Sequence, residues 1–221
     1  MLLAIDTATR YASLALYNGE RVLCEETWHT ANYHTVELVP AIVRMMERQN
    51  IPVERLNAIG VSLGPGSFTG LRIGLGAAKG LALAREIPLL GISTLHMVAI
   101  PHFNWRRGAV CALVEAGRTR YCVQFYRRKR GRWRPVDKPQ LTTAEGLCKM
   151  VEITTLFCGE IDAALAGFLQ ERVAEKAILA SPAASLRRAG YLAESAWARF
   201  QQGEADDIDT LSPIYLQQPA G

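Results

Sequence analysis

The feature that most constrains the fold is a strand, a turn, a helix and a second strand between residues 56 and 93. LNAIGVSL (56–63) has the composition of a buried strand, and apolar residues then recur with helical spacing over about 69–85. PLLGIS (88–93) has the composition of another strand. Such a succession of strand, helix and strand is typical of a layered α/β fold.

The residues before this succession predict a β-hairpin followed by a helix. LLAIDT (2–7), YASLALY (11–17) and RVLCEET (21–27) are short segments of strand-forming residues. Asn18-Gly19 supplies a tight turn between the last two. HTVELVPAIVRMMERQN (34–50) carries apolar residues at helical spacing. The first hundred residues therefore predict a mixed α/β unit.

A second, smaller α/β unit is expected from about Pro101 onward. We expect the units to span 1–103 and 104–221, with the C-terminal helix able to pack back on the first. No linker rich in Gly, Ser or Pro separates them. The expected strands are 108–116, 118–127, 155–159 and 176–180, and the expected helices lie near 142–151, 162–173 and 183–202.

Composition favours a soluble cytoplasmic protein. No apolar run approaches the ~20 residues that a membrane-spanning helix needs, and the N-terminus lacks the basic start of a signal peptide. The five cysteines are an odd number without a CxxC pair, which fits reduced thiols. No HExxH or HxxxH arrangement occurs, so no metal site is expected.

The net charge of +4 is unevenly distributed along the chain. Residues 105–140 carry 11 Lys and Arg against 2 Asp and Glu, which makes them a candidate contact for a polyanion. Within them, RRKRGRWR (127–134) predicts a hairpin tip that is either a solvated turn or an RNA contact, with the tryptophan stacking on a base. The candidate RNA contacts are Arg127, Arg128, Lys129, Arg130, Arg132 and Trp133.

The glycine-rich turn SLGPGSFTGLRIG (62–74) matches no familiar phosphate or nucleophile motif. It lacks the GK[ST] of a P-loop, and it fits neither GxGxxG nor GxSxG. Gly64 and Gly66 permit a close backbone approach, and Ser67 can cap the following helix, so a structural turn is favoured over an anion site at that helix start. The candidate nucleotide or phosphate residues are Asp6 and Thr7, after the first strand, and Ser67; a simple capped turn is the alternative at Asp6.

Four glycines in the helix near 69–85 need an explanation. Each interior glycine costs about 0.5–1 kcal/mol of helix stability relative to alanine. Gly70, Gly74, Gly76 and Gly80 indicate either close packing on the chain's own sheet or contact with a helix of a partner chain. The helix at 34–50 is apolar on more than one flank, which also favours a partner surface.

Several of these segments together resemble the bacterial TsaB (YeaZ) family. They are LLAIDTATRYASLAL (2–16), SLGPGSFTGLRIG (62–74), AAKGLA (77–82), STL (93–95) and SPIYL (212–216), and the resemblance is densest over residues 1–100. Two departures are EAGRTRY (115–121), where the family has an Asp-Ala-Arg-Arg-Gly-like stretch, and Gln217 in place of a common arginine.

The resemblance implies an ASKHA-like fold of two ribonuclease-H-like units, the second reduced. It implies a non-catalytic subunit of the machinery for N6-threonylcarbamoyladenosine at tRNA position 37, which binds the catalytic TsaD subunit, is joined by the ATPase TsaE, and forms a homodimer when alone. This chain alone then requires no cofactor, and ATP or ADP with Mg²⁺ belongs to the complex. The expected interface residues, on helices at about 34–49 and 69–85, are Val36, Val39, Val43, Met46, Leu71, Gly74, Leu75 and Ala78.

Two other classes of function stay open. One is an ASKHA-type phosphotransferase or ATPase, which needs a second phosphate loop that EAGRTRY (115–121) and LFCGE (156–160) match poorly. The same enzyme class includes a metallopeptidase, which needs metal ligands, and the sequence has no HExxH or HxxxH arrangement to supply them. The other class is a free-standing RNA-binding protein that uses residues 105–134.

Overall fold

The computed structural model describes residues 1–30, 34–117 and 119–216. Contacts group them into two compact units. The first unit contains Met1–Met97 and Arg187–Tyr215, and the second contains Val98–Leu186 with Leu216. The sequence-based division at 103/104 left the C-terminal helix able to pack back on the first unit, and its contacts group it with that unit.

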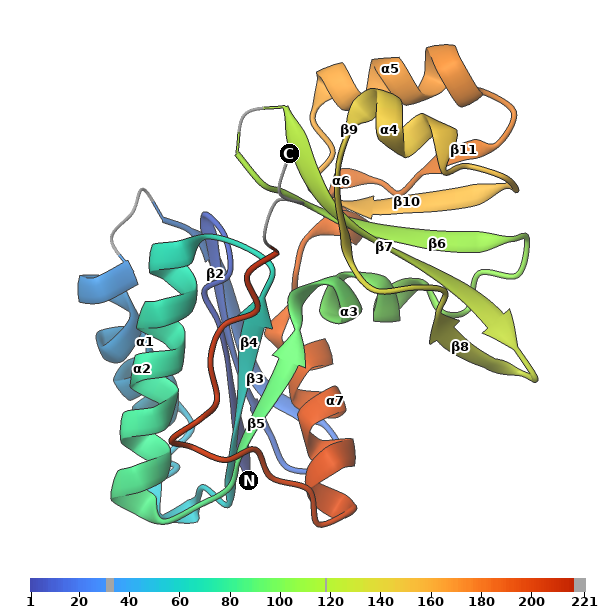
Figure 1. Cartoon of the computed structure of the whole chain (residues 1–221). Coiled ribbons are helices and arrows are strands. Elements are labelled where there is room, and N and C mark those ends of the chain that lie inside the picture. The colour runs from blue at the N-terminus through green and yellow to red at the C-terminus, as the bar shows by residue number, and fades with distance from the viewer. Residues whose placement is uncertain (31–33, 118, 217–221) are drawn as a thin grey trace. The chain divides into compact units, whose positions relative to one another are not determined.

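The first unit is built on a five-stranded sheet in the order β3-β2-β1-β4-β5 (Figure 1). β1 pairs antiparallel with β2 and parallel with β4, which is itself parallel to β5. The alternation of strand side chains directs Leu3 and Ile5 of β1 to one face and Leu2 and Ala4 to the other. The strands are β1 (Leu2–Asp6), β2 (Tyr11–Tyr17), β3 (Val22–His29), β4 (Ala58–Gly64) and β5 (Leu89–Ser93).

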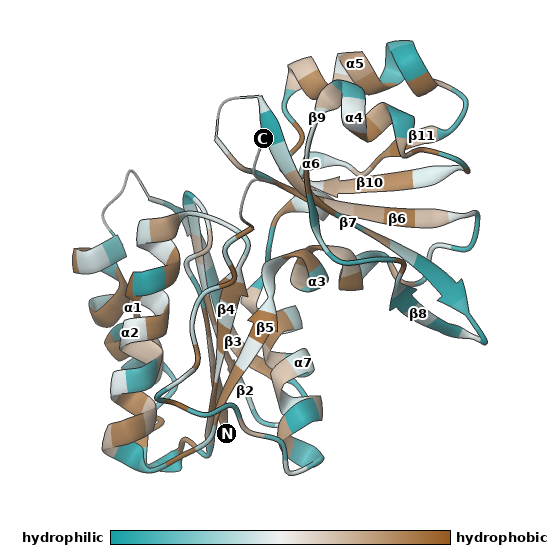
Figure 2. Cartoon of the chain, viewed as in Figure 1, coloured by the Kyte–Doolittle hydropathy of each residue, from teal (hydrophilic) through white to brown (hydrophobic). Residues whose placement is uncertain are grey.

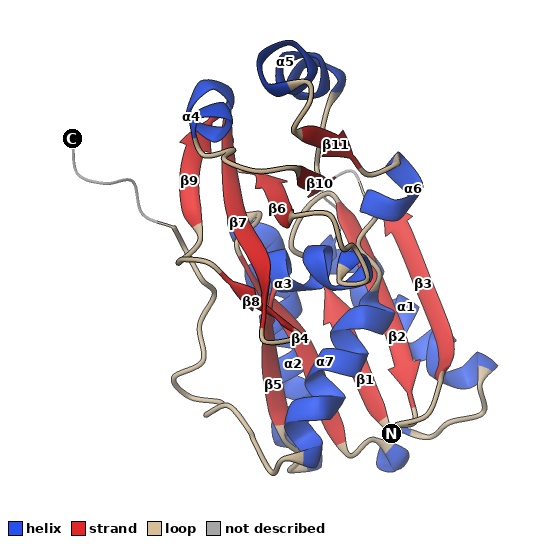
Figure 3. Cartoon of the chain, turned by 90° about the vertical axis from the view of Figure 1, so that its right-hand side faces the viewer, coloured by secondary structure: helices blue, strands red, loops and turns tan. Residues whose placement is uncertain are grey.

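Helices cover both faces of this sheet. The helices α1 (His34–Arg48) and α2 (Phe68–Arg85) pack on the Leu3 face, and α7 (Ala189–Gln201) packs on the Leu2 face. Figure 3 shows α7 in front of the strands and α1 and α2 behind them. A 3-10 turn, η1 (Val53–Arg55), connects α1 to β4. Because both faces are covered, nearly all of β1, β2 and β4 is buried.

The second unit has a six-stranded mixed sheet in the order β11-β10-β6-β7-β8, with β9 also paired to β7. Leu113, Val123 and Phe157 form its core together with α4 and α5. Its strands are β6 (Ala109–Glu115), β7 (Arg120–Lys129), β8 (Arg132–Pro135), β9 (Gln140–Thr143), β10 (Thr155–Gly159) and β11 (Ala177–Leu179). Its helices are α3 (Thr94–Ala99, which begins in the first unit), η2 (Ile100–His102), α4 (Ala144–Lys149), α5 (Ala163–Val173) and α6 (Pro182–Ser185).

The prediction of two mixed α/β units is confirmed, with one important correction. The helix expected near 183–202 is broken into α6 and α7. The backbone of Leu186 and of Arg188 is extended. Because the chain is not helical at this point, the Arg187 side chain can reach the first sheet. Within the described parts of the chain, no helix has the length and apolar character needed to cross a bilayer.

The glycine-rich turn is shaped by close contact with the residues that follow β1. A Cβ added at Gly66 would lie 2.1 Å from the carbonyl oxygen of Ala8, and one at Gly70 would lie 2.2 Å from that of Thr7. A Cβ at Gly76 or Gly80 would meet no atom within 4 Å. A Cβ at Gly74 would lie 2.1 Å from Oγ1 of Thr7, so close packing within the chain explains Gly66, Gly70 and Gly74 but not Gly76 or Gly80.

This contrast gives a prediction for the stability of the first unit. Gly70→Ala should lower the free energy of unfolding by about 1–3 kcal/mol, because the new methyl group overpacks against Thr7. Gly76→Ala should raise it by about 0.5–1 kcal/mol, because alanine is the better helix former. Urea unfolding followed by circular dichroism measures both, and a stabilised Gly70→Ala variant would contradict the close approach.

Candidate functional site

Asp6 at the end of β1 and Thr7 in the turn that follows are two of the three candidate phosphate residues. Both side chains are buried. The Oδ1 of Asp6 accepts a hydrogen bond from the amide of Ala8 at 3.0 Å. Its Oδ2 accepts one from Nε of Arg187 at 2.9 Å, in an ion pair whose side chains are 0% and 3% exposed. The Asp6 carboxylate therefore already has a buried cationic partner.

Arg187 is held on its other side by the same turn. Its Nη2 donates to Oγ1 of Thr9 at 2.6 Å and to the carbonyl of Tyr11 at 3.1 Å. A buried ion pair is stable only when such additional hydrogen bonds satisfy its remaining polar atoms. The guanidinium thus ties the end of β1 and the start of β2 to the segment before α7. Sequence reasoning missed Arg187, since no local pattern links it to a carboxylate 181 positions away.

Thr7 and Ser67 are also engaged within the fold. The hydroxyl of Thr7 donates to the carbonyl of Gly70 at 2.7 Å. Ser67 caps α2, as predicted, by accepting a hydrogen bond from the amide of Gly70 at 3.2 Å, and its own amide donates to Ala8. A Mg²⁺-phosphate group needs carboxylate oxygens and donors that are not already paired. As they are placed here, Asp6, Thr7 and Ser67 do not fit such a group, which corrects the phosphate interpretation.

The predicted partner residues of α1 and α2 divide into exposed and buried sets. Val36, Val39 and Val43 of α1 are 65%, 56% and 47% exposed, and their spacing places them along one side of the helix. The other five are buried because they face the chain's own sheet or the neighbouring helix, although Met46 also lines an open hollow at the end of α1. These buried residues are Met46, Leu71, Gly74, Leu75 and Ala78.

The outward side of α2 consists of other residues. Arg72, Gly76, Gly80 and Leu83 are exposed and recur three or four positions apart, so they follow one side of the helix. The Leu83 side chain is 59% exposed. We call Val36, Val39 and Val43 with Gly76, Gly80 and Leu83 the outer helix surface.

The start of α1 is anchored to the sheet below it. The indole of Trp28 on β3 donates to Oε2 of Glu37 at 3.0 Å, and this hydrogen bond lowers the pKa of Glu37. Nε2 of the buried His34 lies 3.0 Å from the carbonyl oxygen of Thr9. At the other end of α1, an open hollow of about 590 Å³ begins at Val43 and continues to Val53. The three exposed valines therefore stand on a helix whose first turn is fixed.

The basic segment 127–134 forms the hairpin of β7 and β8. Trp133 stacks on Phe103, with ring centroids 5.3 Å apart and planes 8° from parallel, and its indole donates to the Phe103 carbonyl. One face of the Trp133 ring therefore already has an aromatic partner within the chain. Arg127 pairs with Glu152 at 2.9 Å. Arg128, Lys129, Arg130 and Arg132 are exposed.

Three buried cysteines and the spacing of possible metal ligands bear on thiol and metal chemistry. Burial raises the pKa of Cys111 and Cys158, and it raises that of Cys122 to about 11. These three thiols are therefore protonated at neutral pH, whereas the thiolate is the nucleophile. Across the ranges that the structure describes, no three His, Cys, Asp or Glu side chains gather as a metal site would require.

Comparisons with known proteins show which family the chain belongs to. The family model for TsaD, tRNA N6-adenosine threonylcarbamoyltransferase, matches residues 28–220. The Escherichia coli tRNA threonylcarbamoyladenosine biosynthesis protein TsaB is 36% identical over 60% of this chain and 58% of its own length. TsaB of Haemophilus influenzae is 29% identical over 98% of this chain and 93% of its own. The chain belongs to the TsaB (YeaZ) family.

Solved structures with a similar fold also include YeaZ-like proteins. A Pseudomonas aeruginosa protein described as similar to peptidase YeaZ has a TM-score of 0.80 at 25% identity, and the likeness covers 98% of this chain and 99% of that one. A ROK hexokinase from Thermus thermophilus has a TM-score of 0.52 at 11% identity, over 91% and 99% of the two chains, a likeness of fold alone. The TsaB-family chain therefore has the expected ASKHA-like fold.

The buried ion pair predicts a large and coupled effect on stability. Asp6→Asn or Arg187→Met should each lower the free energy of unfolding by about 3–5 kcal/mol, because each leaves a buried partner uncompensated. The double variant should lose clearly less than the sum of the two. Arg188→Met is the control: it removes a half-exposed partner of Glu25 and should cost about 1 kcal/mol or less. Equal losses for Arg187→Met and Arg188→Met in urea unfolding would contradict this account.

Proposed function

We propose that this chain is an accessory, non-catalytic subunit of the machinery that makes N6-threonylcarbamoyladenosine at position 37 of tRNA. Its family and the names of its relatives support this role. Five free cysteines fit work in the cytoplasm, where thiols stay reduced. The observation that carries the proposal is the outer helix surface, which exposes three valines on an anchored helix beside a second helix with two exposed glycines.

The proposed partner of the outer helix surface is a TsaD-type catalytic subunit. The exposed parts of the three valines would contribute favourable free energy to binding when a partner removes them from water. Gly76 and Gly80 have open space around them, so a partner's backbone can approach α2 closely. Without TsaD, a second copy of the chain occupies the same surface. A TsaE-type ATPase joins the assembly, and tRNA is engaged through it.

A supporting role is proposed because the residues suited to phosphate chemistry hold the fold instead. Asp6 is neutralised by Arg187, and the hydroxyl of Thr7 is bonded to the backbone of α2. ATP or ADP with Mg²⁺ is therefore proposed to act within the complex and not to be required by this chain. The hexokinase-like fold favours one competing function, an ASKHA-type phosphotransferase or ATPase. That function needs a second phosphate loop, which EAGRTRY (115–121) and LFCGE (156–160) match poorly, and residue 118 lies outside the described residues.

The experiment mixes the purified chain with its cognate TsaD-type subunit and measures the mass of the complex by size exclusion with light scattering. The wild type should form a 1:1 complex. Val39→Glu with Val43→Glu should weaken it more than tenfold, because two carboxylates would be buried without partners. Val136→Glu with Ile153→Glu is the matched control, since these exposed apolar residues lie in the second unit and add the same charge.

Two results would overturn the proposal. Equal weakening by both pairs of substitutions would mean that added negative charge, and not the outer helix surface, controls assembly. A chain that ignores the TsaD-type subunit and hydrolyses ATP alone would favour the phosphotransferase. Circular dichroism of each variant confirms that it is folded before binding is compared.

A further inference from the structure

The hairpin of β7 and β8 separates its side chains into two different faces. Arg127 lies directly opposite Arg134, and Lys129 lies directly opposite Arg132. Strand side chains alternate with a period of two, so these four cations share one face of the ribbon, which we call the cationic face. Arg128 and Trp133, also a directly opposed pair, share the other face.

The cationic face has too few acidic partners within its own chain. Like charges directly opposite each other on paired strands are destabilising. Glu152 relieves this for Arg127, in a pair whose side chains are 42% and 73% exposed. Among the residues that the structure describes, Lys129, Arg132 and Arg134 form no ion pair. The fold therefore holds an unfavourable set of charges that an external anion would compensate.

The opposite face fixes the ribbon in place. Trp133 stacks on Phe103, whose ring also packs against the buried Tyr126 at 5.4 Å. Nε of Arg128 donates to the carbonyl of Gly131 at 3.2 Å, across the turn. Because the ribbon is held by these contacts, a ligand would not have to order the backbone that carries the cations.

We propose that the cationic face binds the phosphate backbone of RNA. Neighbouring cations lie about 6.6 Å apart along each strand, with strands about 4.8 Å apart, so they form a regular array suited to a repeating anion. Three of the four are arginines, whose planar guanidinium matches phosphate oxygens in bidentate fashion. Figure 2 shows the end of β7 and all of β8 as hydrophilic, which disfavours insertion into a membrane or an apolar protein groove.

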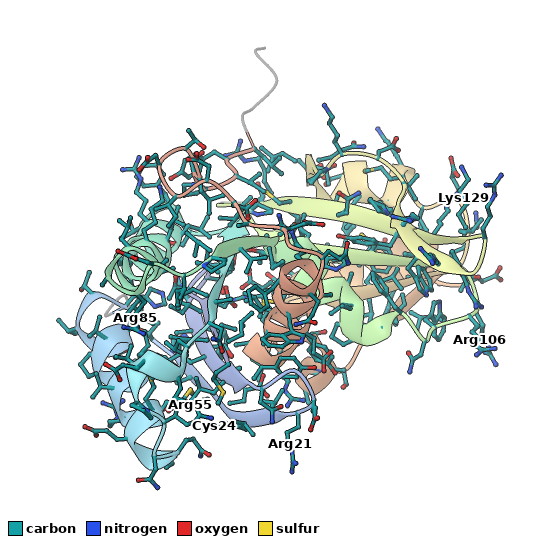
Figure 4. The ribbon with its side chains drawn as sticks, turned by 90° about the horizontal axis from the view of Figure 1, so that it is seen from below. Arg21, Cys24, Arg55, Arg85, Arg106 and Lys129 are labelled. Atoms are coloured by element: carbon teal, nitrogen blue, oxygen red, sulfur yellow. The ribbon has the colours of Figure 1, made fainter. Side chains whose placement is uncertain are left out.

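A second basic segment extends this array. Arg106 and Arg107 are exposed and precede β6. The start of β6 pairs with the end of β7 through Val110 and Tyr126, so the two basic segments meet at the same end of the second sheet. In Figure 4 the side chains of Arg106 and Lys129 both project outward there. The surface is therefore longer than the hairpin alone.

The inference goes beyond the proposed function, which needs no RNA contact from this chain. The choice of RNA over DNA rests on that function; the choice of a phosphate backbone does not. The cationic face belongs to the second unit and the outer helix surface to the first, so the two can be tested separately.

The test measures fluorescence anisotropy of a labelled, unmodified tRNA transcript with the full chain at several salt concentrations. The probed variant is Lys129→Gln, Arg132→Gln, Arg134→Gln. Three lost phosphate contacts should reduce the slope of log affinity against log salt by about two to three, and weaken binding at low salt by more than tenfold. The control, Arg21→Gln, Lys149→Gln, Lys176→Gln, removes the same charge from exposed positions elsewhere and should leave the slope unchanged.

Three outcomes would overturn the inference. They are no binding of tRNA by the wild type, equal losses for the two triple variants, and competition by polyglutamate as effective as that by unlabelled RNA at equal charge. Duplex DNA that binds as tightly as tRNA would overturn the choice of RNA. The variant should still form its complex with the TsaD-type subunit, so that a failure here is distinct from a failure of the proposed function.

Discussion

The ion pair between Asp6 and Arg187 is the contact on which the first unit most depends. It joins the end of the central strand to a residue 181 positions later, and it is almost completely removed from water. Breaking such a pair costs several kcal/mol, a large fraction of a domain's stability. Its position just before α7 also brings that helix onto the sheet. The same guanidinium also bonds to Thr9 and to the carbonyl of Tyr11, so one side chain fixes both ends of the turn that follows β1.

Glycines of α2 lie in two different surroundings, against the chain's own backbone and on the outward side of the helix. At its start, Gly70 lets the helix lie against the backbone of Thr7, and no larger residue fits. Farther along, Gly76 and Gly80 face open space, where alanine would make a more stable helix. Gly76 and Gly80 thus make α2 less stable than alanine would, on its outward side, beside the exposed valines of α1. A partner that packs closely on this side is the physical reason we propose for that cost.

The sequence was informative where a signal is local. Strand alternation, the Asn18-Gly19 turn and the capped start of α2 all predicted the elements of the first unit, and the glycine-rich turn carried the family resemblance. It failed where distant segments meet. Leu71 and Leu75 were expected at an interface, but helical spacing alone does not tell which side of α2 faces the sheet. The stacking of Trp133 on Phe103 was not foreseen, because nothing nearby in sequence indicates that partner. The break between α6 and α7, which lets Arg187 reach the buried Asp6, has no local signature at all.

The discontinuous make-up of the first unit has a consequence during synthesis. Ala189, Leu192, Ala193 and Ala196 of α7 cover the face of the sheet that carries Leu2 and Ala4. Since a ribosome makes the chain from its N-terminus, these strands emerge long before the helix that shields them. The second unit, which is continuous from Val98 to Leu186, can complete its core first. One apolar face of the first sheet then stays open to chaperones or to wrong partners until α7 has been translated.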